Sequence, residues 1–127
     1  MIVVDASAAV LGLLNDGDAR ARLRADALSS PHLVEPEVAH ALRAQVRRGE
    51  LDAGAAQRAL ERWARLGIDR LPATGLLPRI WELRDNLSAY DATYVSAAEA
   101  LGCALVTADS RLAAAPGVRC AVTVVRS

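Results

Sequence analysis

Residues 88–109 read SAYDATYVSAAEALGCALVTAD and combine a helical pattern, a short apolar run and a closing acid. A helix is expected over 89–101, because its apolar positions continue for three turns after a polar start. The run 103–107 that follows has the length and composition of a buried strand, and Asp109 comes directly after it. This change from helical to strand periodicity is typical of an α/β protein with a parallel sheet.

The same alternation extends in both directions from this segment, so we expect one α/β domain over residues 1–127, with no linker or internal repeat. Each strand after the first would be reached by a helical crossover. The expected strands are residues 2–4, 32–34, 69–71, 103–107 and 121–125. The expected helices are residues 6–14, 18–28, 36–48, 53–66, 75–85 and 89–101, with a short helical turn after Asp109.

Composition and charge exclude several classes of function. The chain has 127 residues, of which 53% are hydrophobic, and it carries 15 acidic and 15 basic residues. A chain of this length buries roughly two-thirds of its unfolded surface, enough for a core without disulfides. All the basic residues are arginine, so sites that need a lysine, such as Walker-type phosphate loops and Schiff bases, are excluded. Aromatic residues make up only 3%, which argues against a base-stacking platform.

Cysteine usage and the N-terminal segment predict a cytoplasmic protein. Cys103 and Cys120 form no CxxC motif and start apolar runs, so we expect buried thiols of a reducing compartment and no zinc site. The first residues carry no basic cluster, and Asp5 interrupts their apolar stretch after four residues. A signal peptide or a membrane span is therefore not expected.

Four acids recur where predicted elements meet. Asp5 ends the first strand, Glu37 follows the second, Asp91 opens the helix before the fourth, and Asp109 follows the fourth. Because the carboxyl ends of parallel strands share one edge of the sheet, we expect these four side chains to converge there. Each acid alone has a simpler explanation as a helix cap or turn residue, as in the capping-box spacing that begins at Ser88.

A set of converging carboxylates needs a cation, since like charges otherwise raise one another's pKa values. Oxygen ligands favour hard metals, so Mg²⁺ or Mn²⁺ is the expected cofactor. Such ions activate water against phosphodiesters. The sequence therefore predicts metal-assisted phosphodiester hydrolysis at this edge of the sheet.

At these acids the chain resembles the PIN-domain family, and within it the VapC toxins of bacterial type II toxin–antitoxin pairs. The matching segments are IVVDASAAV, PEVAHAL, SAYDATYVSAAEALG and LVTADSRLA. The resemblance covers essentially the whole chain. It implies a three-layer α/β fold with a five-stranded parallel sheet in the order 3-2-1-4-5. It also implies an Mg²⁺- or Mn²⁺-dependent endoribonuclease that a small VapB-type antitoxin inhibits.

Carried over residue by residue, the resemblance assigns the catalytic set to Asp5, Glu37, Asp91 and Asp109. Asp5, Asp91 and Asp109 would ligate the metal, with Glu37 joining them directly or through water. Thr107 would orient a carboxylate, and Ser7 could support Asp5 or simply belong to the helix start.

Two neighbours of Glu37 leave alternatives open. Glu35 is the rival acid, although the position before Val38 favours Glu37. His40 stands where many relatives have asparagine, and a lone histidine on a helix is more often structural, so we place it outside the site.

Arginines and tryptophans complete the expectations. Arg43 and Arg47 follow Glu37 on the same predicted helix and are candidates for contacts with RNA phosphates, although a solvated helix face explains them equally well. Trp63 and Trp81 lie at apolar helical positions, so both are expected in the core.

The sequence therefore predicts a ribonuclease toxin that binds RNA and an antitoxin and forms a homodimer. Two-fold dimers are the commonest assembly, and the alanine-rich helices would allow close packing. A catalytically silent PIN-like interaction module is the first alternative. An aspartyl-nucleophile phosphatase is the second, but it needs a second aspartate at the position of Ser7.

Overall fold

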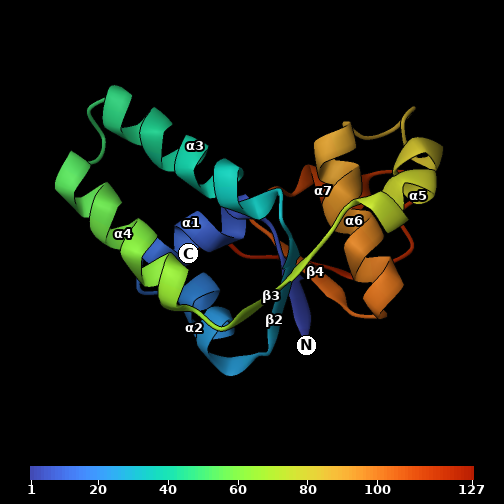
Figure 1. The fold of residues 1–127 in the computed structure, drawn as a ribbon, viewed down its shortest axis with the longest axis horizontal. Helices are drawn as coiled ribbons and strands as arrows, with labels where there is room; N and C mark the ends of the chain where they lie inside the picture. The colour runs from blue at the N-terminus through green and yellow to red at the C-terminus, as the bar shows by residue number, and fades with distance from the viewer.

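The computed structural model describes all 127 residues, with a five-stranded parallel sheet between two groups of helices (Figure 1). The strands follow the order β3-β2-β1-β4-β5, which confirms the predicted class and topology. In the central strand, Ile2 lies opposite Leu28 on one side and Ala104 on the other. The strands are β1 (Ile2–Val4), β2 (Leu28–Pro31), β3 (Ile68–Leu71), β4 (Ala104–Thr107) and β5 (Val122–Val124).

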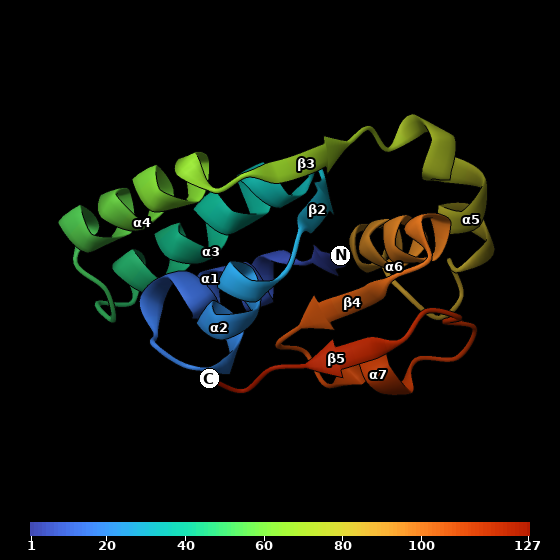
Figure 2. The same ribbon diagram turned by 90° about the horizontal axis from the view of Figure 1, so that it is seen from below.

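The helices form the two outer layers. Figures 1 and 2 show α1 to α4 together on one side of the sheet and α5 and α6 on the other, with α7 beside β5. None of the helices is both long and apolar enough to span a membrane. The helices are α1 (Ala6–Leu14), α2 (Asp18–Ala25), α3 (Val34–Arg47), α4 (Ala53–Arg65), α5 (Leu77–Glu82), α6 (Ala89–Leu101) and α7 (Arg111–Ala114), and the 3₁₀ helix η1 (Thr74–Leu76) precedes α5.

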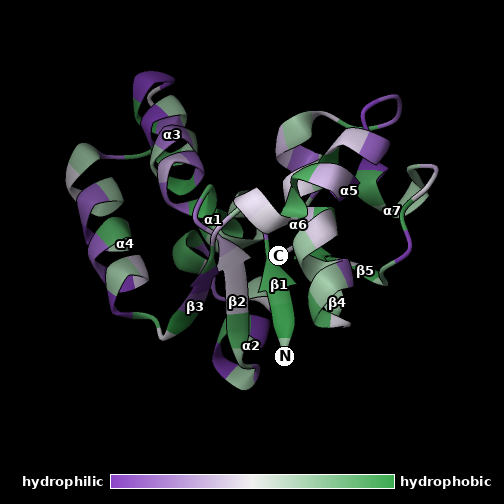
Figure 3. Ribbon diagram, turned by 45° about the vertical axis from the view of Figure 1, so that its right-hand side comes forward, coloured by the Kyte–Doolittle hydropathy of each residue, from purple (hydrophilic) through white to green (hydrophobic).

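The core follows the central strand and α6. Every residue of β1 is buried, and Figure 3 shows this strand in the hydrophobic colour between more polar outer helices. Helix α6 contacts β1, β2 and β4 on one side and α5 on another, and all residues from Ala92 to Ala98 are buried. Small side chains such as Ala97 let the helix lie close to the strands. Asp91, one residue before this buried segment, is thereby held at the sheet edge.

The second strand is not where the sequence predicted it. The expected helix 18–28 ends at Ala25, and Leu28–Pro31 forms β2 in place of residues 32–34. Pairing with both β1 and β3 buries all four residues, and the Ser30 hydroxyl donates to the Val4 carbonyl at 2.7 Å. Two serines and a proline are typical of a turn, but here the two neighbouring strands supply hydrogen-bond partners for the backbone, and the segment is a strand.

Helix α3 correspondingly begins at Val34, earlier than the predicted start at 36. Its buried positions Val34, Val38 and Leu42 recur every four residues and face the core. Pro36 lies in the first turn, where its missing N–H breaks no helical hydrogen bond. Burial of Val34, Val38 and Leu42 fixes the rotation of the helix and therefore the direction of Glu37.

The structure corrects the prediction for one tryptophan and for the thiols. Trp63 is 2% exposed, as expected, but Trp81 is 67% exposed, because the short helix α5 turns Ile80 toward the core and leaves Trp81 outside. The Arg84 guanidinium covers the Trp81 ring at 4.7 Å from its centroid. Both cysteines are free thiols, but they are only half-buried, just before the strands β4 and β5.

Candidate active site

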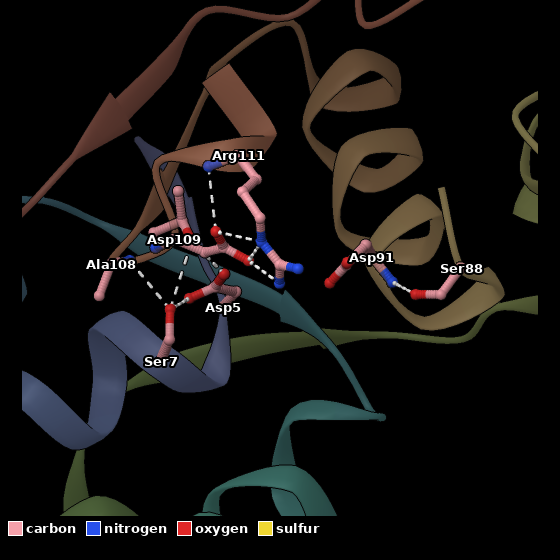
Figure 4. A network of polar contacts seen from close by, with 8 residues as sticks. Asp5, Ser7, Ser88, Asp91, Ala108, Asp109 and Arg111 are labelled. Atoms are coloured by element: carbon pink, nitrogen blue, oxygen red, sulfur yellow. Dashed lines mark hydrogen bonds and ion pairs between the residues drawn. The ribbon is translucent and has the colours of Figure 1, made fainter. Parts of the chain in front are cut away.

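The four predicted acids line one cavity of about 730 Å³ at the carboxyl ends of the central strands. Asp5 follows β1, Glu37 lies in the first turns of α3, Asp91 in the first turn of α6, and Asp109 follows β4. Figure 4 shows Asp5, Asp91 and Asp109 approaching one another from three different elements. The remaining lining residues are Ala6, Ser7, Leu33, Pro36, His40, Ala41, Tyr90 and Tyr94.

Asp5 is the most buried and most firmly held of the four. Its Oδ1 accepts hydrogen bonds from the Ser7 hydroxyl at 2.7 Å and from the Ala8 amide at 3.0 Å, and its Oδ2 accepts from the Thr107 hydroxyl. Burial raises the pKa of Asp5 above its usual value, and the charge of Asp91 adds to this, against the opposing hydrogen bonds. The side chain thus caps α1 and also faces the cavity.

Ser7 and Thr107 tie two segments of the site together. The Thr107 hydroxyl accepts from the Asp109 amide at 3.0 Å, and the Ser7 hydroxyl accepts from the Ala108 amide at 2.9 Å. The two hydroxyls lie 3.2 Å apart. Residues about one hundred positions apart are therefore fixed relative to each other, which is the geometry that a supporting role requires.

Glu37 is held by a residue that the sequence analysis did not single out. The Tyr94 hydroxyl donates to Glu37 Oε1 at 2.6 Å. Burial and the neighbouring Glu37 carboxylate both raise the pKa of Tyr94, so the phenol stays protonated and remains a donor. Tyr94 follows Asp91 by three residues and so shares its helix face, a spacing that could have indicated it.

Glu35, the rival acid, points elsewhere. It accepts hydrogen bonds from the Trp63 indole at 2.8 Å and from Arg70. Its burial favours a higher pKa, but these bonds outweigh that effect and hold the pKa of Glu35 below its usual value. Its place in the structure is therefore an ion pair between α3 and β3, outside the acidic cavity.

Asp91 and Asp109 have opposite electrostatic environments. Burial and the charge of Asp109 raise the pKa of Asp91, while the hydrogen bonds of Arg111 lower that of Asp109. Ser88 caps α6 by accepting from the Asp91 amide at 3.1 Å, as its spacing predicted. Arg111 is the one cation that bonds any of the four acids.

The donor set fits a hard divalent cation in its chemistry. Four carboxylates line one cavity, only Asp109 is paired with a cation, and burial raises the pKa values of Asp5 and Asp91, with a smaller contribution from the neighbouring carboxylates. In the present arrangement no three acidic, histidine or cysteine side chains are close enough to hold one ion. Asp109 in particular is turned toward Arg111.

Two further predictions concern residues of α3. His40, which the sequence analysis places outside the site, lines the acidic cavity. Arg43 and Arg47 are exposed and border a separate groove of about 410 Å³ between α3 and α4. They lie about 9 and 15 Å beyond Glu37 along the helix axis, from the rise per residue.

Comparison with known proteins shows the family of this chain. Residues 2–118 match the family model described as the PIN domain. The chain is 56% identical over 125 residues to VapC ribonuclease Mb0985 of Mycobacterium bovis, covering 98% of each chain. The crystal structure of PAE2754 from Pyrobaculum aerophilum superposes with a TM-score of 0.70 at 30% identity, covering 95% of this chain and 81% of that one.

A more distant likeness extends the same fold. The structure of VapBC2 from Rickettsia felis, bound to a DNA fragment from its promoter, gives a TM-score of 0.69 at 16% identity, covering 99% of this chain and 100% of that chain. At this identity the likeness concerns the fold alone. The family match, the full-length identity and the four acids at one sheet edge lead to the same assignment: the chain belongs to the PIN-domain family and, within it, to the VapC ribonucleases.

Proposed function

We propose that this protein is an endoribonuclease toxin that hydrolyses RNA phosphodiester bonds with Mg²⁺ or Mn²⁺. The observation that carries the proposal is the convergence of Asp5, Glu37, Asp91 and Asp109 on one cavity. The identity to VapC ribonucleases supports the substrate class. An aspartyl-nucleophile phosphatase is disfavoured, because Ser7 is engaged in holding Asp5 and Ala108.

The residues of the cavity would have different roles in hydrolysis. Asp5, Asp91 and Asp109 would hold the cation, which when bound supplies positive charge and Lewis acidity toward a phosphodiester. Ser7 and Thr107 keep Asp5 in one rotamer, so that it needs little reorganisation. Tyr94 does the same for Glu37. Hydrolysis would proceed by direct attack of water, without a covalent intermediate.

The test is cleavage of total bacterial RNA by the purified protein with Mg²⁺ or Mn²⁺, and with excess chelator. Asp5→Asn, Glu37→Gln, Asp91→Asn and Asp109→Asn should each lower the rate at least about 100-fold while the circular dichroism spectrum is retained. Glu35→Gln and the exposed Asp85→Asn are the controls and should cleave at the normal rate. Cleavage that persists in chelator would refute the metal requirement.

The same experiment separates this proposal from a catalytically silent interaction module. Such a module would give no cleavage with either metal, and its RNA would be unaffected by every substitution. Arg43 and Arg47 are our candidates for phosphate contacts, because both are exposed on the helix that carries Glu37. Replacing both with alanine should weaken RNA binding and reduce its dependence on salt.

We further propose an antitoxin partner and a homodimer. Support for the antitoxin comes from membership of the VapC ribonucleases. Support for the dimer comes from Leu77 and Trp81, one turn apart on α5, which are 55% and 67% exposed. Expression of the chain alone should arrest growth, and co-expression with the neighbouring gene product should relieve it. Light scattering should give twice the monomer mass, and Trp81→Glu should give a monomer.

A further inference from the structure

The ion pair between Asp109 and Arg111 occupies a carboxylate of the proposed metal site. Arg111 Nη2 lies 2.7 Å from Asp109 Oδ2, and Nε lies 3.0 Å from Oδ1. The backbone amide of Arg111 also donates to Oδ1, at 3.0 Å. Both oxygens of Asp109 are therefore engaged by a residue two positions further along the chain, as Figure 4 shows.

This pairing would compete with metal binding through Asp109. The guanidinium already bonds both carboxylate oxygens, which are the atoms that a divalent cation would ligate, and its positive charge would repel the cation. Asp109 lines the same cavity as Asp5 and Asp91, but its carboxylate is paired with Arg111, and no three acidic side chains are close enough to hold one ion in this arrangement. In the metal-free protein the charge of Asp109 is thus neutralised by Arg111 of the same chain.

The ion pair between Asp109 and Arg111 can also separate at low cost. The Arg111 side chain is 86% exposed and that of Asp109 27%, and exposed ion pairs of this kind are weak. A divalent cation held also by Asp5 and Asp91 would have more ligands than the guanidinium has and would therefore compete with it for Asp109. Arg111 can leave without disturbing the core.

The displaced guanidinium would remain beside the reacting groups. Figure 4 shows it between Asp109 and Asp91, two of the acids that line the cavity. Its planar fork of N–H donors matches two oxygens of a phosphate as well as it matches a carboxylate. The residue is thus placed to contact RNA when the carboxylate has been taken by the metal.

We propose that Arg111 exchanges partners, neutralising Asp109 in the metal-free protein and binding an RNA phosphate once a divalent cation has displaced it. The inference rests on the proposed function, since it assumes a metal at Asp109 and an RNA substrate. It predicts opposite effects of one substitution: Arg111→Gln strengthens metal binding and weakens RNA binding.

The first measurement is calorimetric titration of the full chain with Mn²⁺ in the absence of RNA. Arg111→Gln should bind Mn²⁺ about two- to fivefold more tightly, which is the strength of an exposed ion pair converted to an equilibrium constant. Arg65→Gln removes the same charge from an exposed position on α4 that has no hydrogen-bond partner, and it should leave the Mn²⁺ affinity unchanged. The far-ultraviolet circular dichroism of both variants should match the parent.

The second measurement is equilibrium binding of a hydrolysis-resistant phosphorothioate RNA of 20 nucleotides in saturating Mn²⁺. Arg111→Gln should bind it more weakly, and the slope of log affinity against log salt should become shallower by about 0.7, the value for one phosphate contact on a single strand. Without metal the RNA affinities of Arg111→Gln and the parent should differ less, because Arg111 of the parent is then paired with Asp109. Arg65→Gln should follow the parent in both conditions.

The outcomes separate this inference from the function on which it rests. Equal Mn²⁺ affinity of Arg111→Gln and the parent, or tighter binding in Arg65→Gln to the same degree, would overturn the competition. Unchanged RNA affinity and salt slope in Mn²⁺ would overturn the phosphate contact. If neither the parent nor Arg111→Gln binds Mn²⁺, the metal site itself is refuted, and this inference with it.

Discussion

The substitution Thr107→Val should destabilise the metal-free protein in a pH-dependent way. Thr107 is fully buried, donates to the Asp5 carboxylate and accepts from the Asp109 amide. Valine keeps the shape but removes a hydrogen bond to a charged group, which contributes about 1.5–3 kcal/mol at neutral pH. When Asp5 is protonated, the lost bond is one between neutral groups, which contributes about 0.5–1.5 kcal/mol. The cost of the substitution should therefore fall as the pH is lowered.

The sign follows from the raised pKa of Asp5. When the pKa of a carboxyl group is higher in the folded than in the unfolded state, the protein loses stability as the pH rises through the folded-state pKa. Removing the Thr107 donor raises the folded-state pKa of Asp5 further. Urea unfolding in excess chelator between pH 4 and pH 8 measures the loss of unfolding free energy in Thr107→Val. The loss expected at pH 7 corresponds to a drop in Tm of about 6–12 °C. Thr123→Val on β5, whose hydroxyl makes no hydrogen bond within the protein, is the control. An equal loss at both ends of the pH range would refute the coupling between Thr107 and ionised Asp5.

Three further predictions concern other parts of the site and the surface. Tyr94→Phe removes the donor to Glu37 and should lower the cleavage rate by about tenfold with little change in KM. The free energy of unfolding should fall by about 1.5–3 kcal/mol, the contribution of a hydrogen bond to a charged group. A normal rate would show that the bond is only structural. Asp91→Asn should raise the Tm of the metal-free protein at pH 7 but not at pH 3. Burial and Asp109 raise the pKa of Asp91, so the ionised carboxylate destabilises the fold at pH 7 and the neutral amide does not. Differential scanning fluorimetry measures both Tm values, and an equal or lower Tm of the variant at pH 7 would contradict the raised pKa. In the proposed dimer acrylamide should quench both tryptophans weakly, whereas dilution to the monomer should expose Trp81 but leave the buried Trp63 shielded; strong quenching of Trp81 at every protein concentration would show that this surface is not the dimer contact.

The sequence alone was sufficient for the features that depend on near neighbours along the chain. The apolar triplet Ile2–Val4, the cap at Ser88 and the acids that follow β1 and β4 all reflect local backbone geometry and burial pattern. The prediction that acids meet at one sheet edge needed only the parallel class, because that class puts the carboxyl ends of all strands together. The choice of Glu37 over Glu35 came from its position in the motif, and the structure places only Glu37 in the cavity.

Tertiary structure decided the features that depend on distant partners. Leu28–Pro31 is a strand because β1 and β3 bond it on both sides, a stabilisation that no local propensity contains. Trp81 is exposed because its short helix presents Ile80 to the core instead. The bonds from Thr107 to Asp5 and from Tyr94 to Glu37 join residues 102 and 57 positions apart, so the support of the site exists only in the folded chain. The physical reason is that a sequence pattern specifies which face of an element is buried, whereas the packing of elements specifies which side chains meet.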